Sequence, residues 1–116
     1  MSKAKILLAF HLNLRYIYIV HIITRKRLLE FGDKHPDTVS ALEHWYRTAK
    51  HNDFAAFSEL RKTFTGVDQV GRLVVINIGG NKARLIAYVV YRKKRIYIRH
   101  ILTHKEYNKG KWKEKA

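Results

Sequence analysis

Three apolar segments follow one another in the second half of the chain, and two short turns join them. In order these are the segment Leu73–Ile78, the turn Gly79-Gly80-Asn81, the segment Ala83–Tyr91, the turn Arg92-Lys93-Lys94-Arg95 and the segment Ile96–Leu102. Apolar runs of this length between glycine-rich or strongly polar turns are typical of adjacent antiparallel strands. The sequence therefore predicts a meander of three strands, and any fold for this chain has to be built around that sheet.

The residues before the meander predict one strand followed by helices. Val20–Thr24 is rich in β-branched residues, which favours a short first strand. Thr24 is then placed to cap a helix over residues 25–35, and we expect Gly32 and Pro36 to bring that helix to an end.

Two further helices are expected before the meander begins. Asp37 is placed to cap one from Thr38 to about Lys50, whose apolar residues recur at helical spacing. Phe54–Phe64 predicts a shorter one, with aromatic residues spaced like a packed helical face. The expected order is β-α-α-β-β-β followed by a C-terminal segment. This is an α+β fold, an antiparallel sheet of three to four strands with two to three helices packed on one face.

The balance of charge limits the partners of the chain. Its 116 residues fit a single domain and contain 24 Lys and Arg against 9 Asp and Glu, a net charge of +15. Such an excess indicates a polyanionic partner, namely nucleic acid, an anionic membrane surface or an acidic protein. The absence of cysteine excludes disulfides and thiolate sites, and no apolar run is long enough for a transmembrane helix. The lack of cysteine is compatible with a reducing cytoplasm, and we expect no membrane partner.

The second turn sets the register of the two strands around it. If Arg92–Arg95 is a four-residue loop, the pairs are Tyr91 with Ile96, Tyr88 with Arg99, Ile86 with Ile101 and Arg84 with Thr103. Paired residues share a face of the sheet. One face then carries two arginines and two tyrosines: Arg84, Tyr88, Tyr97 and Arg99. The other packs on the helices through Leu85, Ala87, Val89, Ile96 and Ile98.

A dense polar cluster, Thr103-His104-Lys105-Glu106-Tyr107, ends the last strand. Arginine forks match phosphate oxygens, and tyrosine rings stack on unpaired bases, so the whole face favours RNA. A solvated sheet face with long arginines explains any one of these residues, but it explains the set less well in so basic a chain. His100 and His104 are three residues apart at a strand end without a cysteine or acidic partner, so we expect no metal and no cofactor.

These motifs together resemble the HigB toxins of bacterial type II toxin–antitoxin modules, a branch of the RelE-like RNA interferases. The segments that carry the resemblance are His21–Thr24, the Gly79-Gly80-Asn81 turn with Arg84, Tyr97-Ile98-Arg99 and the closing Thr103–Tyr107. It covers about Val20 to Tyr107. It implies a RelE-like fold and a cytoplasmic toxin that cleaves messenger RNA, usually in the ribosomal A site. It also implies a HigA-like helix-turn-helix antitoxin as partner.

The expected chemistry assigns a role to each candidate residue. An enzyme that uses the 2′-hydroxyl of RNA must remove its proton, neutralise the phosphorane and protonate the leaving 5′-oxygen. His104 is the expected acid or base, and Glu106 is the alternative base. Arg84 and Arg99 would stabilise the phosphorane, and Tyr107 would stack on a base or donate a proton. The residues expected to bind RNA are Lys82, Tyr88, Arg92, Lys93, Tyr97 and Lys105.

The resemblance also bears on residues 1–19. Members of the family typically begin with a methionine where this chain has Val20, and a GTG codon for valine is a bacterial start codon. We therefore expect residues 1–19 to be an extension from an upstream start, followed by one toxin domain over residues 20–116.

Two other functions remain open at this point. A non-catalytic basic RNA-binding module is one, although the tail from Tyr107 to Lys115, with Gly110, is a poor match to the basic helix of a double-stranded-RNA-binding domain. A basic ribosome-associated protein without site chemistry is the other.

Overall fold

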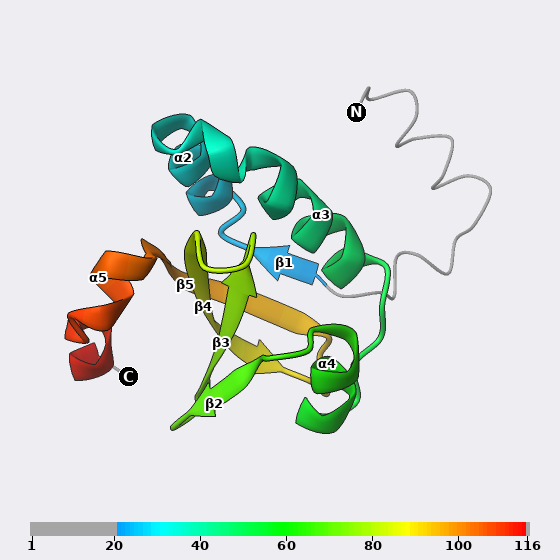
Figure 1. Cartoon of the computed structure of the whole chain (residues 1–116). Coiled ribbons are helices and arrows are strands. Elements are labelled where there is room, and N and C mark those ends of the chain that lie inside the picture. Colours follow the sequence, from blue (N-terminus) through cyan, green and yellow to red (C-terminus); the bar gives the residue numbers. More distant parts are fainter. Residues whose placement is uncertain (1–20, 116) are drawn as a thin grey trace, which may run out of the picture.

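A computed structural model describes residues 21–115 of the chain. The elements are β1 (His21–Ile23), α2 (Lys26–Lys34), the 3-10 turn η2 (Pro36–Thr38), α3 (Val39–Lys50), α4 (Phe57–Thr63), β2 (Asp68–Val70), β3 (Leu73–Ile78), β4 (Ala83–Val90), β5 (Arg95–Thr103), α5 (His104–Asn108) and η3 (Lys111–Lys115). The expected α+β class is confirmed (Figure 1). The extension expected over residues 1–19 lies outside the described residues.

The five strands form one mixed sheet in the order β1-β5-β4-β3-β2. β1 runs parallel to β5, whereas all other neighbours are antiparallel. The expectation of three to four antiparallel strands is therefore corrected in two ways. First, β1 pairs in parallel with β5, the last strand of the meander. Second, a fifth strand, β2, pairs with β3 through only three residues. Two of the three β2 residues are exposed, so β2 has little apolar signal in the sequence.

Three helices cover one face of the sheet, as expected. Side chains from α2, α3 and α4 form the main core with the inward residues of the strands, and Leu28, Trp45 and Leu60 represent the three helices in it. Figure 1 shows α2 and α3 above the sheet and α4 beyond the end of α3. Within residues 21–115, no helix is long and apolar enough to span a membrane.

The expected helix caps are wrong. Thr24 adopts a left-handed backbone (φ +68°), and its hydroxyl donates to the Ile98 carbonyl at 2.9 Å, so it joins α2 to β5 rather than capping α2. Asp37 lies inside the 3-10 turn, and the N-cap of α3 is Thr38, without a side-chain hydrogen bond. Gly32 does not end α2. It is buried inside the helix, where a Cβ would come within 3.1 Å of Val39 Cγ2.

The register between β4 and β5 differs from the expected one. The loop has four residues, but it is Tyr91–Lys94 rather than Arg92–Arg95, and the Lys94 N–H donates to the Tyr91 carbonyl at 3.1 Å. Lys94 takes the left-handed backbone that closes this turn (φ +54°). The observed pairs include Tyr88 with Tyr97, Ile86 with His100, Leu85 with Ile101, Arg84 with Leu102 and Ala83 with Thr103. All four expected pairs are therefore wrong.

A β-bulge explains why most side chains nevertheless lie on their expected faces; Ile101 is an exception, because it packs against the main core on the helix side. Near the loop the register is shifted by two residues, which keeps every side chain on its expected face. Arg99 is then the extra residue of a bulge between the pairs at Ile98 and His100. Side chains expected on the helix face, among them Leu85 and Ile96, do pack there.

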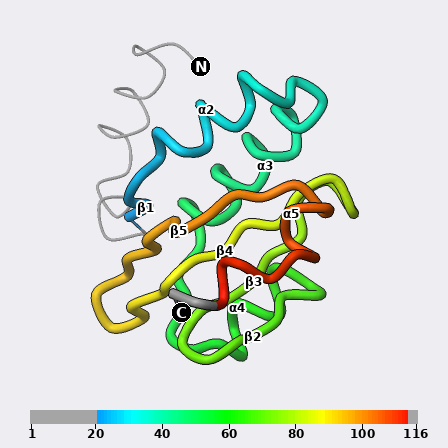
Figure 2. Tube along the Cα trace, turned by 90° about the vertical axis from the view of Figure 1, so that its left-hand side faces the viewer, coloured from blue at the N-terminus to red at the C-terminus, as the bar shows by residue number. Residues whose placement is uncertain are grey.

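The C-terminal segment covers part of the opposite face. The Trp112 side chain, 4% exposed, forms a second small core with Leu73, Val75 and Ile86. Figure 2 shows this segment, orange to red, lying against β3 and β4. The tail is therefore two short helical turns that are docked on the sheet, and α5 is held at the end of β5.

Candidate active site

Arg84 is the centre of the candidate site. Its side chain is only 8% exposed, although it lies on the face of the sheet away from α2, α3 and α4. The guanidinium donates to the carbonyls of Gly80 (3.4 Å) and Ala83 (3.2 Å) and to Asn81 Oδ1 (3.1 Å). These acceptors belong to the β3–β4 turn or its edge, which needs Gly79 and Gly80 because both take left-handed backbone conformations (φ +59° and +70°). The turn thus holds the arginine fork in a fixed orientation.

The helix α5 brings two more candidate residues to Arg84. His104 Nδ1 lies 3.3 Å from Arg84 Nη2, and the Arg84 guanidinium carbon lies 5.5 Å from the centre of the Tyr107 ring. Tyr107 also stacks on Trp112, with ring centres 5.3 Å apart. Of the five residues expected to be catalytic, two, His104 and Tyr107, therefore contact Arg84.

Glu106 takes part in capping α5. Its Oε1 accepts from the Thr103 N–H at 2.9 Å, while the Glu106 N–H donates to Thr103 Oγ1 at 3.2 Å. This reciprocal capping box satisfies two backbone donors at the start of the helix. The hydrogen bond from the Thr103 backbone holds the pKa of the Glu106 carboxyl below its usual value, and the nearby charges of His35 and Lys109 act in the same direction.

This lowered pKa predicts how the stability depends on pH. A carboxyl whose pKa is lower in the folded protein stabilises it above the unfolded-state pKa of about 4.3, and this contribution is lost as the pH falls through the folded-state pKa. We expect wild type to be more stable than Glu106→Gln at neutral pH, with the difference shrinking below about pH 4. Urea unfolding of both proteins at neutral and acid pH measures this. A difference that does not change with pH would contradict the assignment.

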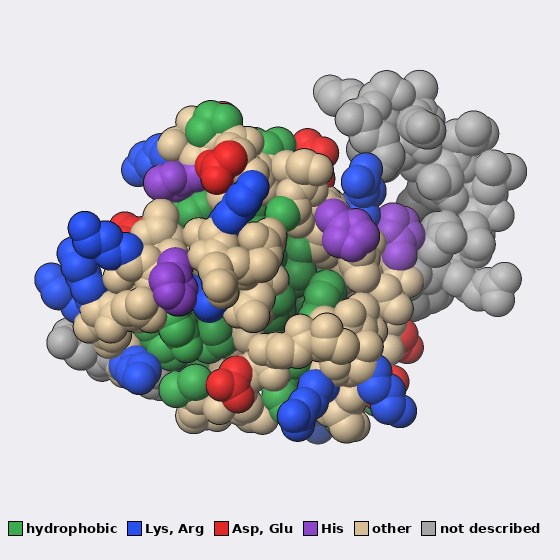
Figure 3. Space-filling model, viewed as in Figure 1, with side chains coloured by type: hydrophobic (Ala, Val, Ile, Leu, Met, Phe, Trp, Pro, Cys, Tyr) green, Lys and Arg blue, Asp and Glu red, His purple; other side chains and the backbone are tan. Residues whose placement is uncertain are grey.

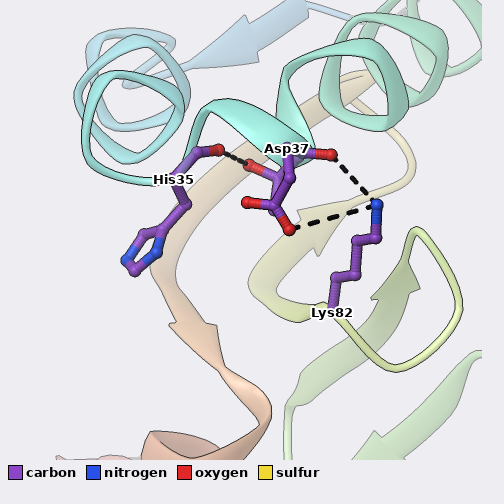
Figure 4. Close-up of polar contacts among 4 residues, drawn as sticks. His35, Asp37 and Lys82 are labelled. Carbon is purple, nitrogen blue, oxygen red and sulfur yellow. Dashed lines mark hydrogen bonds and ion pairs between the residues drawn. The ribbon is translucent and has the colours of Figure 1, made fainter.

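Lys82 reaches away from Arg84, towards the start of α3. Its ammonium lies 3.2 Å from the Asp37 carbonyl oxygen and 4.0 Å from Asp37 Oδ2 (Figure 4). Both side chains are more than half exposed, so this ion pair adds little stability, about 0–1 kcal/mol. It does tie the β3–β4 turn, which orients Arg84, to the turn between α2 and α3.

Other expected residues lie apart from this centre. Arg92 and Lys93 are exposed in the Tyr91–Lys94 loop, at the opposite end of β4 from Arg84, roughly 20 Å away along the strand. Arg99 is the bulge residue of β5, half-buried, and among the described residues it contacts neither Arg84 nor His104 through a hydrogen bond or ring contact. Lys105 is exposed on α5.

The two tyrosines on this face form a pair. Tyr88 and Tyr97 are cross-strand partners, with ring centres 6.3 Å apart. The Arg72 guanidinium lies over the Tyr88 ring at 5.8 Å, and Arg95 Nη1 lies 3.5 Å from the Tyr97 hydroxyl. Aromatic rings flanked by arginines suit single-stranded nucleic acid, which stacks its bases and offers its phosphates.

Positive side chains gather on α5, beside the candidate centre. Figure 3 shows Lys and Arg side chains gathered over α5, at the left of the view, with few acidic ones among them. Over residues 21–115, no cluster of three or more His, Asp or Glu side chains is arranged to hold a metal ion. The candidate centre itself consists of a guanidinium, an imidazole and a phenol.

Three residues of the centre were not predicted from the sequence. Asn81 accepts from Arg84, Asn108 lies 3.3 Å from His104, and Trp112 donates from Nε1 to the Tyr107 carbonyl at 3.2 Å. Asn108 follows His104 by four residues, which was a usable signal, because such residues are neighbours on a helix. Nothing in the sequence placed Trp112 over the sheet.

Comparison with known proteins assigns the family. The HigB toxin family, described as the RelE-like toxic component of a toxin-antitoxin system, matches residues 38–110. The chain is 36% identical over 93 residues to an mRNA interferase HigB of Escherichia coli O6:H1, covering 78% of this chain and 90% of that protein. The mRNA interferase toxin HigB of Escherichia coli K12 is 33% identical over 92 residues, covering 77% and 88%.

The chain belongs to the HigB toxin family. The resemblance drawn from its sequence motifs is therefore confirmed, and the matched residues include Arg84, His104 and Tyr107. As a HigB toxin the chain is one component of a toxin–antitoxin pair, and the antitoxin is its partner by definition of the family.

Proposed function

We propose that this HigB toxin is an mRNA interferase that cleaves messenger RNA in the cytoplasm and thereby inhibits translation. The observation that carries the proposal is the buried Arg84 guanidinium facing the His104 imidazole at the end of the sheet. An arginine fork matches phosphate oxygens, and imidazole exchanges protons near neutral pH. Both relatives are named mRNA interferases, which supports the same reaction.

In the proposed reaction the RNA supplies its own nucleophile. His104 accepts the proton of the 2′-hydroxyl, the 2′-oxygen bonds to phosphorus, and the bond from phosphorus to the 5′-oxygen breaks. The products are a 2′,3′-cyclic phosphate and a 5′-hydroxyl. Arg84 neutralises the charge that develops on the phosphorane, and Arg99 and Lys105, which form no hydrogen bond with Arg84 within residues 21–115, add to the positive field that holds the RNA.

Tyr107 is the proposed donor to the leaving 5′-oxygen. Its ring already contacts Trp112 and Arg84, so the hydroxyl is the better placed part of the side chain for a role in the reaction. The proton that His104 takes up returns to Tyr107 through water, which restores both groups. Glu106 is the less favoured base, because its carboxylate is held by the Thr103 N–H.

The RNA strand is proposed to follow the face of the sheet that carries the Tyr88–Tyr97 pair. These rings would stack bases, and Arg92 and Lys93 would bind phosphates at the far end of the hairpin. Cleavage is proposed to take place on messenger RNA in the ribosomal A site, and a HigA-like helix-turn-helix antitoxin is proposed to neutralise the toxin.

Lys82 is proposed to contact the RNA backbone, and its partner Asp37 makes this testable. If Lys82 binds phosphate, Lys82→Met weakens RNA binding, whereas Asp37→Asn leaves the ammonium available and preserves or strengthens binding. If Lys82 only holds the turn, Lys82→Met loses the ion pair and the hydrogen bond to the Asp37 carbonyl, whereas Asp37→Asn loses the ion pair alone, and neither variant changes the salt dependence of binding. Affinity for a single-stranded RNA, measured at two salt concentrations, distinguishes the two cases, because a lost phosphate contact also lowers the salt slope by about one.

The end groups of the products test the proposed reaction. Messenger RNA from a translating extract treated with the purified toxin should carry 2′,3′-cyclic phosphate and 5′-hydroxyl ends at new cleavage sites. Products with 5′-phosphate ends would contradict the use of the 2′-hydroxyl. A toxin that binds RNA and produces no new ends would instead be a non-catalytic RNA-binding protein.

A further inference from the structure

His104 lies between two side chains that both present nitrogen atoms. Arg84 Nη2 is 3.3 Å from His104 Nδ1, and Asn108 Nδ2 is 3.3 Å from His104 Nε2. A guanidinium has only donors, so His104 Nδ1 can take part in this contact only as an acceptor. The Nδ1 lone pair therefore faces Arg84 in this arrangement.

A neutral imidazole with a lone pair on Nδ1 carries its proton on Nε2. The Nε2–H then needs an acceptor, and an amide nitrogen cannot supply one. The oxygen and nitrogen of an asparagine amide have nearly the same shape, and their assignment follows from the hydrogen bonds that they make. Turning the Asn108 amide over places Oδ1 against the Nε2–H and satisfies all three groups.

We propose that Asn108 is a positioning residue for His104: its Oδ1 accepts from the Nε2–H and thereby fixes the tautomer that presents Nδ1 as the base. The fold supports this role. Asn108 follows His104 by one helical turn, so the two side chains are neighbours on α5. The capping box at Thr103 holds one end of α5, and the Trp112 hydrogen bond to the Tyr107 carbonyl holds the other.

The consequence for the reaction rests on the proposed function. Before RNA binds, Arg84 occupies the Nδ1 lone pair. When a phosphate oxygen takes the Arg84 donor, Nδ1 becomes available for the proton of the 2′-hydroxyl. The Nε2–H donates to Asn108 Oδ1 throughout the reaction, so the imidazolium that forms keeps a hydrogen-bond acceptor for its Nε2–H. A histidine oriented by an asparagine in this way is a known catalytic arrangement in other enzymes.

The tautomer can be observed directly. Long-range proton–nitrogen correlation spectra of the ¹⁵N-labelled full-length protein, at mildly alkaline pH, distinguish a protonated Nε2 from a protonated Nδ1. The His104→Gln variant assigns the signal. We expect wild-type His104 to be the Nε2–H form, Asn108→Leu to give a mixture of tautomers, and Asn108→Asp to restore the Nε2–H form. Asn52→Ala, which removes an asparagine bonded to Thr48 in α3, should leave the pattern unchanged.

Two spectroscopic outcomes would overturn the proposal. One is a wild-type His104 protonated on Nδ1, and the other is an Asn108→Leu spectrum identical to that of wild type. In cleavage assays, Asn108→Leu should lower the rate about 10-fold or more while Asn108→Asp retains most of it, and equal rates for wild type and Asn108→Leu would refute the positioning role. If wild type shows the expected tautomer and does not cleave RNA, the proposed function fails and the assignment of Asn108 stands.

Discussion

Replacing Arg84 by alanine is expected to reduce the cleavage of translated messenger RNA by about 100- to 1000-fold, the usual cost of removing one preorganised donor to a developing anion. The guanidinium is held by the β3–β4 turn and faces His104, so this donor is already oriented in the folded protein. The rate of appearance of new 5′ ends in a translating extract measures the effect.

The control for this variant has to separate chemistry from folding. Arg84 is buried and hydrogen-bonded, so its loss is also expected to lower the free energy of unfolding by about 1–3 kcal/mol. Arg84→Lys keeps the charge but not the fork, and its rate should be intermediate. Arg61→Ala, an exposed arginine on α4, should cleave like wild type. Full activity of a folded Arg84→Ala protein would remove Arg84 from the mechanism.

Replacing Trp112 by alanine is expected to lower the free energy of unfolding by about 3–5 kcal/mol, the usual cost of truncating a buried tryptophan. Trp112 seals the small core on the second face of the sheet and stacks on Tyr107. Its loss therefore both opens a cavity and releases α5, and the rate of RNA cleavage should fall as well. Urea unfolding and the cleavage assay measure the two effects on the same protein.

The matched control is Trp112→Phe. Phenylalanine keeps most of the apolar contact but loses the Nε1–H that donates to the Tyr107 carbonyl. We expect it to recover more than half of the lost stability. If Trp112→Ala unfolded at the same urea concentration as wild type, the C-terminal segment would not be docked on the sheet in solution.

The meander was predictable because its signals are local. The apolar run Leu73–Ile78 and the glycines after it indicate a strand and a left-handed turn by themselves. The register of the next hairpin was not predictable in this way, because the bulge at Arg99 depends on how two strands fit together. The sequence does contain a trace of it: the inward residues Ile96 and Ile98 are two apart, whereas Ile101 follows after three.

The candidate site was predictable only in part, for a similar reason. Arg84 and His104 could be brought together because the hairpin between them has few possible registers, and an error of one or two residues still leaves them at the same end of the sheet. The roles of Glu106 and Lys82 were not predicted, because each depends on a partner in the folded protein. Glu106 bonds to Thr103, and Lys82 pairs with Asp37. The position of Trp112 depends on the docking of the tail, which has no periodic signal.

The fold positions the residues of the proposed reaction directly. Two turns at one end of the sheet supply the centre: the β3–β4 turn orients Arg84, and the first turn of α5 presents His104 and Tyr107. The capping box and Trp112 fix α5 from its two ends. A fixed arrangement of donors suits a reaction that depends on stabilising charge in the transition state.

The most direct test of the central claim is to express wild type, Arg84→Ala and His104→Ala separately in bacterial cells and to map new 5′ ends on their messenger RNA. We predict growth arrest and new ends with wild type, and neither with the two variants at equal protein levels. New ends with all three proteins would contradict the proposed site, and no new ends with wild type would contradict the proposed function.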